Sequence, residues 1–311
     1  MRVLGIDIGG TEIKAGIVDG NGRVLEARSV PTPADLGAFQ AALREAAGFD
    51  AQVEGAGIGC KGVINPRTTR VEILPGTVHF LEGTCLAELV RPLLGREVPV
   101  AADNDARVAM AGEMVWGAAR GRADALMLTL GTGVGGAAVV NGGLLRGQTG
   151  AAGHLGHVTI DADGPLCICG NHGCLETCFS AKAIEAEAFR VIHFGCESRL
   201  TEWFRERPRE VTCQAVFEAA AEGDGAARRI VERAIHRLSA ALAGLLHIFD
   251  PEVVIVGGRI AAAGEALFDP LRREVAWRTR VMMAREVPVV RAQIADHTGV
   301  VGAAALVMRE R

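Results

Sequence analysis

The stretch RVLGIDIGGTEIKAGIVDGNGRVLEARSV, from Arg2 to Val30, contains the pattern on which the fold depends. Its apolar residues alternate in the manner of β-strands, and the segment Asp19–Gly22 (DGNG) is typical of a hairpin turn between two such strands. A similar pattern recurs in DALMLTLGTGVGGAAVVNGGLLRGQ, from Asp124 to Gln148, with Asn141-Gly142 at its second turn. This weak internal repeat predicts two domains built on one plan.

Strand and helix patterns alternate along the rest of the chain. The segment LGAFQAALREAAG predicts a helix at 36–48, and VPVAADNDARVAMAGEMVWG predicts a strand that runs into a helix at 98–117. A long helix is expected from about Ala226 to Phe249, and PEVVIVGGRIAAAGEALFDPLRREV predicts a strand, a glycine turn and a helix at 251–275. The alternation predicts an α/β protein with mixed sheets.

The boundary between the two domains is predicted near Gly117–Arg122, where a helix ends in glycines before the second set of strands. We expect residues 1–118 to form a smaller N-terminal α/β domain and residues 119–298 to form a larger C-terminal α/β domain. The last segment, 299–311, is predicted to be a helix that returns to the first domain, which would make that domain discontinuous.

Composition excludes several classes of protein. The chain has 311 residues, 49% hydrophobic and 23% charged, which indicates a globular protein, and its net charge of −4 gives no sign of a nucleic-acid or membrane partner. The first apolar run is broken at Asp7 and is too short for a signal peptide, and no apolar run reaches the length of about 18 residues that a transmembrane helix needs. A cytoplasmic location is expected, so the eight cysteines are expected to be reduced.

Three glycine-rich turns each follow an apolar strand directly. They are DIGGT at 7–11, LGTGVGG at 130–136 and VGG at 256–258. Glycine lets the backbone approach an anion closely, and successive N–H groups can bind oxyanions. Each turn alone could be a structural tight turn, but the three together favour nucleotide binding. None has the spacing of a Walker or Rossmann motif.

The segment ADNDA at 102–106 places an amide and two carboxylates where a strand is expected to run into a helix. Asp103 or Asn104 could serve as the helix cap, since Asp and Asn are favoured there. A second acid at the same strand end suggests a general base, because a carboxylate placed against a hydroxyl group can accept its proton.

The segment GHLGHVTIDADGPLCICGNHGCLE at 153–176 concentrates three cysteines within eight residues. In a reducing compartment such a cluster indicates a metal site or a catalytic thiol, and the alternative is a set of reduced cysteines near a flexible loop. His172 inside the loop and Cys178 just after it are rival ligands, for which a surface histidine and a small buried thiol are the favoured interpretations. The four isolated cysteines are expected to pack as small hydrophobic residues, at Cys60, Cys85, Cys196 and Cys213.

Taken together, the motifs DIGGTEIK, DNDA, LGTGVGG, GHLGHV, CICGNHGCLE and IVGGRIAAAGE resemble the ROK (repressor/open reading frame/kinase) family of sugar kinases, within the actin–hexokinase superfamily. They occur in the family's order from Asp7 to about Glu265, and the cysteine signature is the specific part. The resemblance implies an α/β, two-domain actin/hexokinase-like (ribonuclease H-like) fold with an active-site cleft between the domains. It also implies a glucokinase-like, ATP-dependent sugar kinase with Mg²⁺ and a structural Zn²⁺, assembled as a homodimer.

The resemblance also implies roles for individual residues. Asp105 would be the base that accepts the proton of the hydroxyl being phosphorylated. The sugar would be bound by Asn104, His154, His157 and Glu176. ATP and its phosphates would be bound by Asp7, Gly9, Gly10, Thr11, Lys14, Thr132, Gly133, Gly257 and Gly258. The zinc ligands would be His157, Cys167, Cys169 and Cys174, a closed set of one nitrogen and three thiolates that leaves no position for water and is typical of structural zinc.

The sequence departs from the family pattern in three places. His154 stands where the family's sugar kinases usually have Glu, Cys60-Lys61 stand where small or apolar residues are usual, and Arg259 stands where a third glycine is common. Since an imidazole can accept fewer hydroxyl protons than a carboxylate, glucose is expected to be a poor or secondary substrate. The alternatives are a kinase for N-acetylmannosamine or another hexose or hexosamine, and a sugar-sensing ROK protein without turnover. No helix-turn-helix pattern precedes the first strand, so a regulator is not expected.

Overall fold

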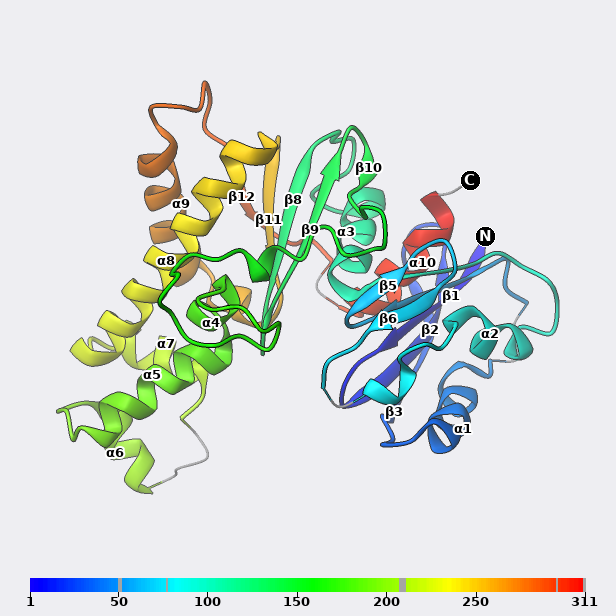
Figure 1. Ribbon diagram of the computed structural model, residues 1–311, viewed down its shortest axis with the longest axis horizontal. Helices are drawn as coiled ribbons and strands as arrows, with labels where there is room; N and C mark the ends of the chain where they lie inside the picture. Colours follow the sequence, from blue (N-terminus) through cyan, green and yellow to red (C-terminus); the bar gives the residue numbers. More distant parts are fainter. Residues whose placement is uncertain (50–51, 77, 207–210, 295, 310–311) are drawn as a thin grey trace. The chain divides into compact units, whose positions relative to one another are not determined.

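The computed structural model describes residues 1–49, 52–76, 78–206, 211–294 and 296–309, and its elements are drawn in Figure 1. The chain packs as two compact units. Unit 1 consists of Met1–Ala123, Ala137–Gly153 and Ala292–Arg311, and unit 2 of Asp124–Gly136 and His154–Arg291. Both contain helices and strands, and the predicted α/β class with mixed sheets is confirmed. The domain boundaries at 118 and 298 stay a prediction.

The main sheet of unit 1 has five strands in the order β3-β2-β1-β4-β7. They are β1 (Arg2–Ile8), β2 (Glu12–Asp19), β3 (Val24–Pro31), β4 (Ala56–Cys60) and β7 (Val100–Asn104). The β1-β2-β3 pairs are antiparallel, whereas β4 lies parallel to both β1 and β7. The segments that follow β1, β4 and β7 therefore meet at one edge of the sheet.

The other elements of unit 1 are α1 (Leu36–Ala47), the hairpin of β5 (Val63–Asn65) and β6 (Arg70–Ile73), α2 (Leu86–Val90), α3 (Asp105–Trp116) and α10 (Thr298–Arg309). Helix α10, red in Figure 1, packs against α3 and β1. A Cβ atom at Gly57 would lie 1.7 Å from the carbonyl oxygen of Ala303, and one at Gly5 would lie 2.0 Å from that of Val300. Glycines on β1 and β4 thus let the terminal helix lie directly on the sheet.

A buried charge network ties α3 to the segment before His154. Arg107 is fully buried; its Nε donates to Asp103 Oδ1 at 2.5 Å, and its two terminal nitrogens donate to the carbonyl oxygens of Ala152 and Gly150 at 2.6 and 2.8 Å. Arg146 Nε donates to the other oxygen of Asp103 at 2.8 Å. A buried carboxylate with two guanidinium partners is satisfied on both oxygens, so the network fixes how residues 146–152 lie against α3.

Replacing Arg107 by methionine is expected to lower the free energy of unfolding by about 3–5 kcal/mol, because it removes a charged partner of the buried Asp103 and leaves two carbonyl groups without their donor. Urea unfolding of wild type and variant would measure this difference. Arg228→Met is the matched control, since Arg228 is exposed and its ion pair with Glu232 lies on the surface of one helix. An equal decrease in the free energy of unfolding in both variants would contradict a structural role for the network.

The second sheet has the order β10-β9-β8-β11-β12. Its strands are β8 (Ala125–Leu130), β9 (Val134–Val140), β10 (Gly143–Leu144), β11 (Val253–Gly257) and β12 (Val289–Arg291). The parallel pairs are β8-β11 and β11-β12. Both sheets have the same plan: three strands that are consecutive in the chain lie side by side, and two later strands extend the sheet in parallel. This agrees with the internal repeat seen in the sequence.

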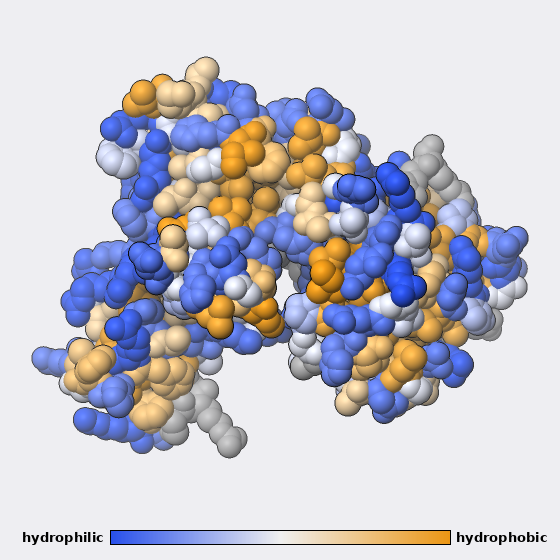
Figure 2. Space-filling model, in the orientation of Figure 1, coloured by the Kyte–Doolittle hydropathy of each residue, from blue (hydrophilic) through white to orange (hydrophobic). Residues whose placement is uncertain are grey.

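Unit 2 contains the helices α4 (Leu175–Cys178), α5 (Ala181–His193), α6 (Arg199–Glu206), α7 (Cys213–Ala221), α8 (Gly225–Phe249) and α9 (Glu265–Thr279). The helix expected from about Ala226 to Phe249 is confirmed as α8, which packs against α9 and α7. Among the described residues, no helix combines the length and apolar character needed to cross a membrane. Figure 2 shows polar and apolar side chains interspersed over the visible face.

Candidate functional site

Several residues predicted to bind substrate or to act in catalysis lie at the carboxyl ends of the parallel strands in the unit 1 sheet. Asp7 is the second-last residue of β1 and pairs with Gly59 of β4, while Cys60 at the end of β4 pairs with Asn104 at the end of β7. Asp105, the first residue of α3, follows Asn104 directly. Parallel pairing therefore brings two carboxylates, from β1 and from the β7–α3 junction, to the same edge.

Asn104 and Asp105 divide two tasks at the start of α3. Asn104 is the N-cap: its side-chain oxygen accepts from the backbone N–H of Ala106 at 3.0 Å, and its Nδ2 donates to the carbonyl oxygen of Gly62 at 3.0 Å. Asp105 Oδ1 accepts from the same N–H at 2.9 Å, and its side chain stays accessible to solvent. Of the two candidates for the helix cap, Asp103 and Asn104, it is Asn104 that caps α3. Asp105 is therefore not needed as the cap and can serve as a proton acceptor.

The electrostatics of this edge favour proton acceptance. The protein packed round the accessible Asp105 carboxylate desolvates it and raises its pKa, while the Ala106 N–H and the charge of Lys61 act in the opposite direction. Burial, followed by the negative charge of Asp105, raises the pKa of Asp7 to about 6. Burial also raises the pKa of the Cys60 thiol, which stays neutral. A carboxylate with a raised pKa is a stronger base than an ordinary one.

The first glycine turn lies beside Asp7. The N–H of Gly9 donates to the carbonyl oxygen of Glu12 at 3.0 Å, and Gly10 and Thr11 are exposed at its tip. A Cβ atom at Gly299, at the start of α10, would lie 2.2 Å from Asp7 Oδ2. Because Gly299 has no side chain, the Asp7 carboxylate can lie against the start of α10. Lys14, predicted to bind phosphate, pairs with Asp7 across β1 and β2 and forms an ion pair with Glu12.

In unit 2, the second glycine turn lies against Glu176. Residues 131–133 connect β8 to β9, and the backbone N–H of Val134 donates to Glu176 Oε2 at 2.9 Å. A Cβ atom at Gly133 would lie 2.2 Å from that oxygen, so only glycine leaves space for the carboxylate. Thr132 is exposed at the tip of the turn. The predicted sugar-binding residue Glu176 and the predicted phosphate turn are thus in direct contact.

The third glycine turn lies beside the second. Gly257, at the end of β11, pairs with Thr129 of β8. Gly258 has a φ angle of +85°, and a Cβ atom there would lie 2.3 Å from the carbonyl oxygen of Leu130. Glycine is required at this position for both the backbone conformation and the close approach. Arg259, one of the departures from the family pattern, is exposed at the start of the next turn of helix.

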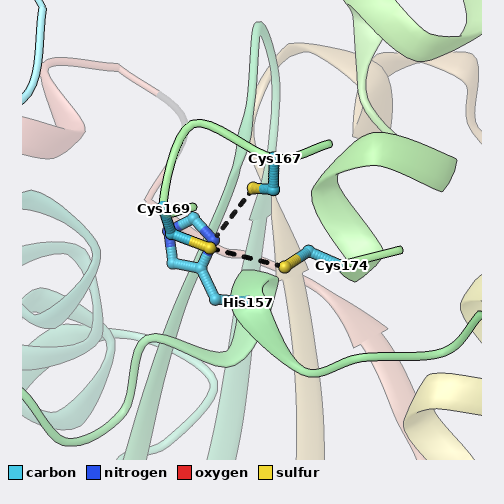
Figure 3. A group of neighbouring side chains, drawn as sticks. All are labelled: His157, Cys167, Cys169 and Cys174. Atoms are coloured by element: carbon cyan, nitrogen blue, oxygen red, sulfur yellow. Dashed lines mark hydrogen bonds between the residues drawn. The ribbon is translucent and has the colours of Figure 1, made fainter. Parts of the chain in front are cut away.

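Four side chains of the cysteine segment converge on one point (Figure 3). The ligand atoms of His157, Cys167, Cys169 and Cys174 all lie within 4.8 Å of one another. His157 Nδ1 is 3.5 Å from Cys167 Sγ, and Cys169 Sγ is 3.6 Å from Cys174 Sγ. Sulfur ligands of a tetrahedral zinc ion with Zn–S bonds of about 2.3 Å would be about 3.8 Å apart, so the donor set fits this metal.

The rival ligands lie elsewhere. His172 Nδ1 forms a hydrogen bond with the carbonyl oxygen of Gly164 at 3.0 Å, and Cys178 is a buried thiol in α4. Of the isolated cysteines, Cys60 and Cys213 are buried as expected and Cys85 is partly buried. The expectation is wrong for Cys196, which is exposed just after α5, where the chain has turned away from the core.

Two histidine rings lie side by side in the loop before the cysteines. The ring centroids of His154 and His157 are 6.3 Å apart with an interplanar angle of 29°, and the His157 N–H donates to the carbonyl oxygen of His154 at 3.0 Å. His154, the residue that departs most from the family pattern, is thereby held next to a member of the cysteine–histidine cluster.

The sequence analysis did not identify Arg107, Arg146 or Gly299. Arg107 lies four residues after Asp103, which is the spacing of a helical ion pair, but the strand-to-helix junction between them concealed that signal. Arg146 and Gly299 are 43 and 292 positions away from the carboxylates they contact, and no local pattern indicates such pairs.

Comparison with known proteins gives consistent results. The model of the ROK family matches residues 3–310. Glucokinase of Thermotoga maritima is 34% identical over 99% of this chain and 97% of its own length, and N-acetylmannosamine kinase of Shigella boydii is 31% identical over the full length of both. A crystal structure of a ROK family glucokinase from Streptomyces griseus, in complex with glucose and AMPPNP, superposes with a TM-score of 0.84 at 32% identity, covering 99% of this chain and 100% of that one.

Proposed function

This chain belongs to the ROK family and is an ATP-dependent sugar kinase, and we propose that it phosphorylates a hexose hydroxyl with Asp105 as the general base. The observation that carries the proposal is the accessible Asp105 carboxylate at a sheet edge where its pKa is raised, beside the glycine turn that follows β1. A base of this kind must be both reachable by a substrate hydroxyl and basic enough to accept its proton.

In the proposed reaction, Asp105 accepts the hydroxyl proton while the sugar oxygen forms a bond to the γ-phosphorus and the bond to ADP breaks. Asn104 would orient the sugar from the start of α3, where its side-chain amide also contacts Asp105. Glu176 would accept a second hydroxyl while it holds the Val134 N–H, and His154 and His157 would complete the sugar contacts.

The glycine turns supply the phosphate contacts in this proposal. Gly9, Gly10 and Thr11 would offer backbone N–H groups beside Asp7 and Lys14, and Thr132 and Gly133 would do so from the second turn. Gly257 and Gly258 would lie near the adenosine. Mg²⁺ bound with ATP would neutralise the charge that develops on the phosphates. These roles rest on the match between this chain's motifs and the family pattern and on the close approach of other groups to the backbone at Gly133 and Gly258.

We also propose that His157, Cys167, Cys169 and Cys174 bind one structural zinc ion. Four donors are the number that a structural zinc ion takes, and the segment between residues 158 and 173 has few buried apolar side chains of its own. The last ligand, Cys174, is the N-cap of α4, two residues before Glu176. The metal would therefore hold the short helix that presents Glu176 to the second glycine turn.

Substrate choice is tested with a panel of sugars. Wild-type protein with Mg-ATP and glucose, mannose, N-acetylmannosamine or N-acetylglucosamine would be assayed for ADP and for the sugar phosphate. At least one sugar should give both products in equal amounts. Sugar binding without ADP formation would instead support the alternative of a sugar-sensing protein.

His154 favours N-acetylmannosamine or another hexosamine as a second candidate substrate, a choice supported by the Shigella boydii relative. A carboxylate at this position could accept two hydroxyl protons of glucose, and a neutral imidazole accepts one. His154→Glu is therefore expected to raise kcat/KM for glucose relative to the best native sugar by about ten- to a hundredfold. If wild type already prefers glucose and the ratio does not change in the variant, position 154 does not select the sugar.

A homodimer that binds no nucleic acid and resides in the cytoplasm is part of the same proposal. These features rest on the resemblance to the family and on the mixed surface charge of the chain.

A further inference from the structure

Lys61 lies next to the proposed base, although the two residues are 44 positions apart in the chain. In the parallel pair of β4 and β7, the last residues, Cys60 and Asn104, lie opposite each other. Lys61 and Asp105 are the next residues of the two chain segments, so they start side by side. Adjacent strands are about 4.8 Å apart. The backbone of Lys61 therefore lies next to that of Asp105, at a position where the family pattern has small or apolar residues, and its charge acts on the carboxylate.

The turn that carries Lys61 is fixed against the β7–α3 junction. Asn104 Nδ2 donates to the carbonyl oxygen of Gly62 at 3.0 Å, and Gly62 has a φ angle of +90° that glycine adopts without strain. The exposed ammonium group of Lys61 donates to the carbonyl oxygen of Pro75 at 3.2 Å. A long, flexible side chain is thus held in one place, with two of its three ammonium hydrogens left for other acceptors.

Charged and titratable groups from three elements face Asp105. Asp7 on β1 is a negative neighbour that disfavours a second charge, and the Cys60 thiol of β4 is neutral. Arg107 on α3 is positive and also lowers the pKa of Asp105, although less than Lys61 does, and its guanidinium nitrogens donate to the buried Asp103 and to two carbonyl groups. Lys61 is the cation with the larger effect, and its charge opposes the rise in the pKa of Asp105 that desolvation causes.

We propose that Lys61 is a positioning residue of the kinase, whose ammonium group keeps the Asp105 carboxylate ionised and ready to accept the proton of the sugar hydroxyl. Lys61 itself exchanges no proton in the reaction: the proton passes from the hydroxyl to Asp105. The inference rests on the proposed function, since it requires Asp105 to be the base.

The test is the pH profile of kcat/KM, measured as sugar phosphate formed from Mg-ATP and the best sugar of the panel. The acidic limb of this profile reports the essential base of the free enzyme. Removing a neighbouring opposite charge raises the pKa of a carboxyl group, so Lys61→Gln should move the acidic limb upward by about one pH unit. On the plateau at higher pH, kcat/KM should stay within about threefold of wild type, because Asp105 is ionised there in both proteins.

Two further variants make the result specific. Lys61→Arg keeps the charge and should leave the limb near its wild-type position. Arg44→Gln removes one positive charge from the exposed face of α1 in the same unit and should not move the limb. The inference is overturned if the limb of Lys61→Gln does not move, if Arg44→Gln moves it equally, or if Lys61→Gln lowers kcat/KM by one factor at every pH. A wild-type protein that phosphorylates no sugar at any pH would overturn the proposed function instead.

Discussion

Replacing Asp105 by asparagine is expected to lower sugar phosphorylation by about 10²–10⁴-fold with the fold intact. Asparagine keeps the size of the side chain, and its oxygen can still accept the Ala106 N–H at the start of α3. It cannot take up the hydroxyl proton. The measurement is kcat with saturating Mg-ATP and sugar, together with thermal unfolding of both proteins.

Asp35→Asn is the matched control for this substitution. Asp35 caps α1 in the same unit by accepting from the Ala38 N–H, and asparagine is an equally good N-cap, so this variant should keep wild-type activity. If Asp105→Asn retains activity within a few-fold of wild type, another group accepts the proton. A variant that unfolds at a much lower temperature than wild type would show instead that Asp105 acts in folding.

Replacing Cys169 by serine is expected to remove the bound metal and to weaken sugar binding. Protein purified without added zinc should contain about one equivalent of zinc per chain, and the variant should contain almost none, because serine is a poor ligand for this ion. Without the metal, Cys174 no longer holds the start of α4, and Glu176 loses its fixed place against Gly133. Metal analysis and sugar titration would measure the two effects.

Cys196→Ser provides the control, since Cys196 is an exposed thiol outside the cluster and its loss should change neither metal content nor sugar affinity. Cys169 is exposed as well, so its replacement causes little loss of packing. Wild-type protein that is free of metal and fully active would contradict the zinc assignment. Loss of zinc with unchanged sugar affinity would leave the metal site but remove its proposed role in holding Glu176.

The sequence by itself determined the elements whose signals are local. The DGNG turn at 19–22 and the apolar runs on either side of it define the β2-β3 hairpin, since turn chemistry and a two-residue period act within a few positions. The spacing of Cys167, Cys169 and Cys174 lies within one loop, so the cluster could be predicted before its geometry was known. The same holds for the cap at Asn104, where strand pattern and helix pattern meet.

Only the tertiary structure decided which distant residues meet at each site. The register of β4 with β7 sets Lys61 beside Asp105, and α10 brings Gly299 against Asp7 from the other end of the chain. Glu176 reaches the second glycine turn because α4 follows the cysteine loop. These contacts depend on strand pairing and on close backbone approach between segments 42 or more positions apart. A local sequence pattern carries no information about such pairs, because the same residues would satisfy the same local rules in any other register.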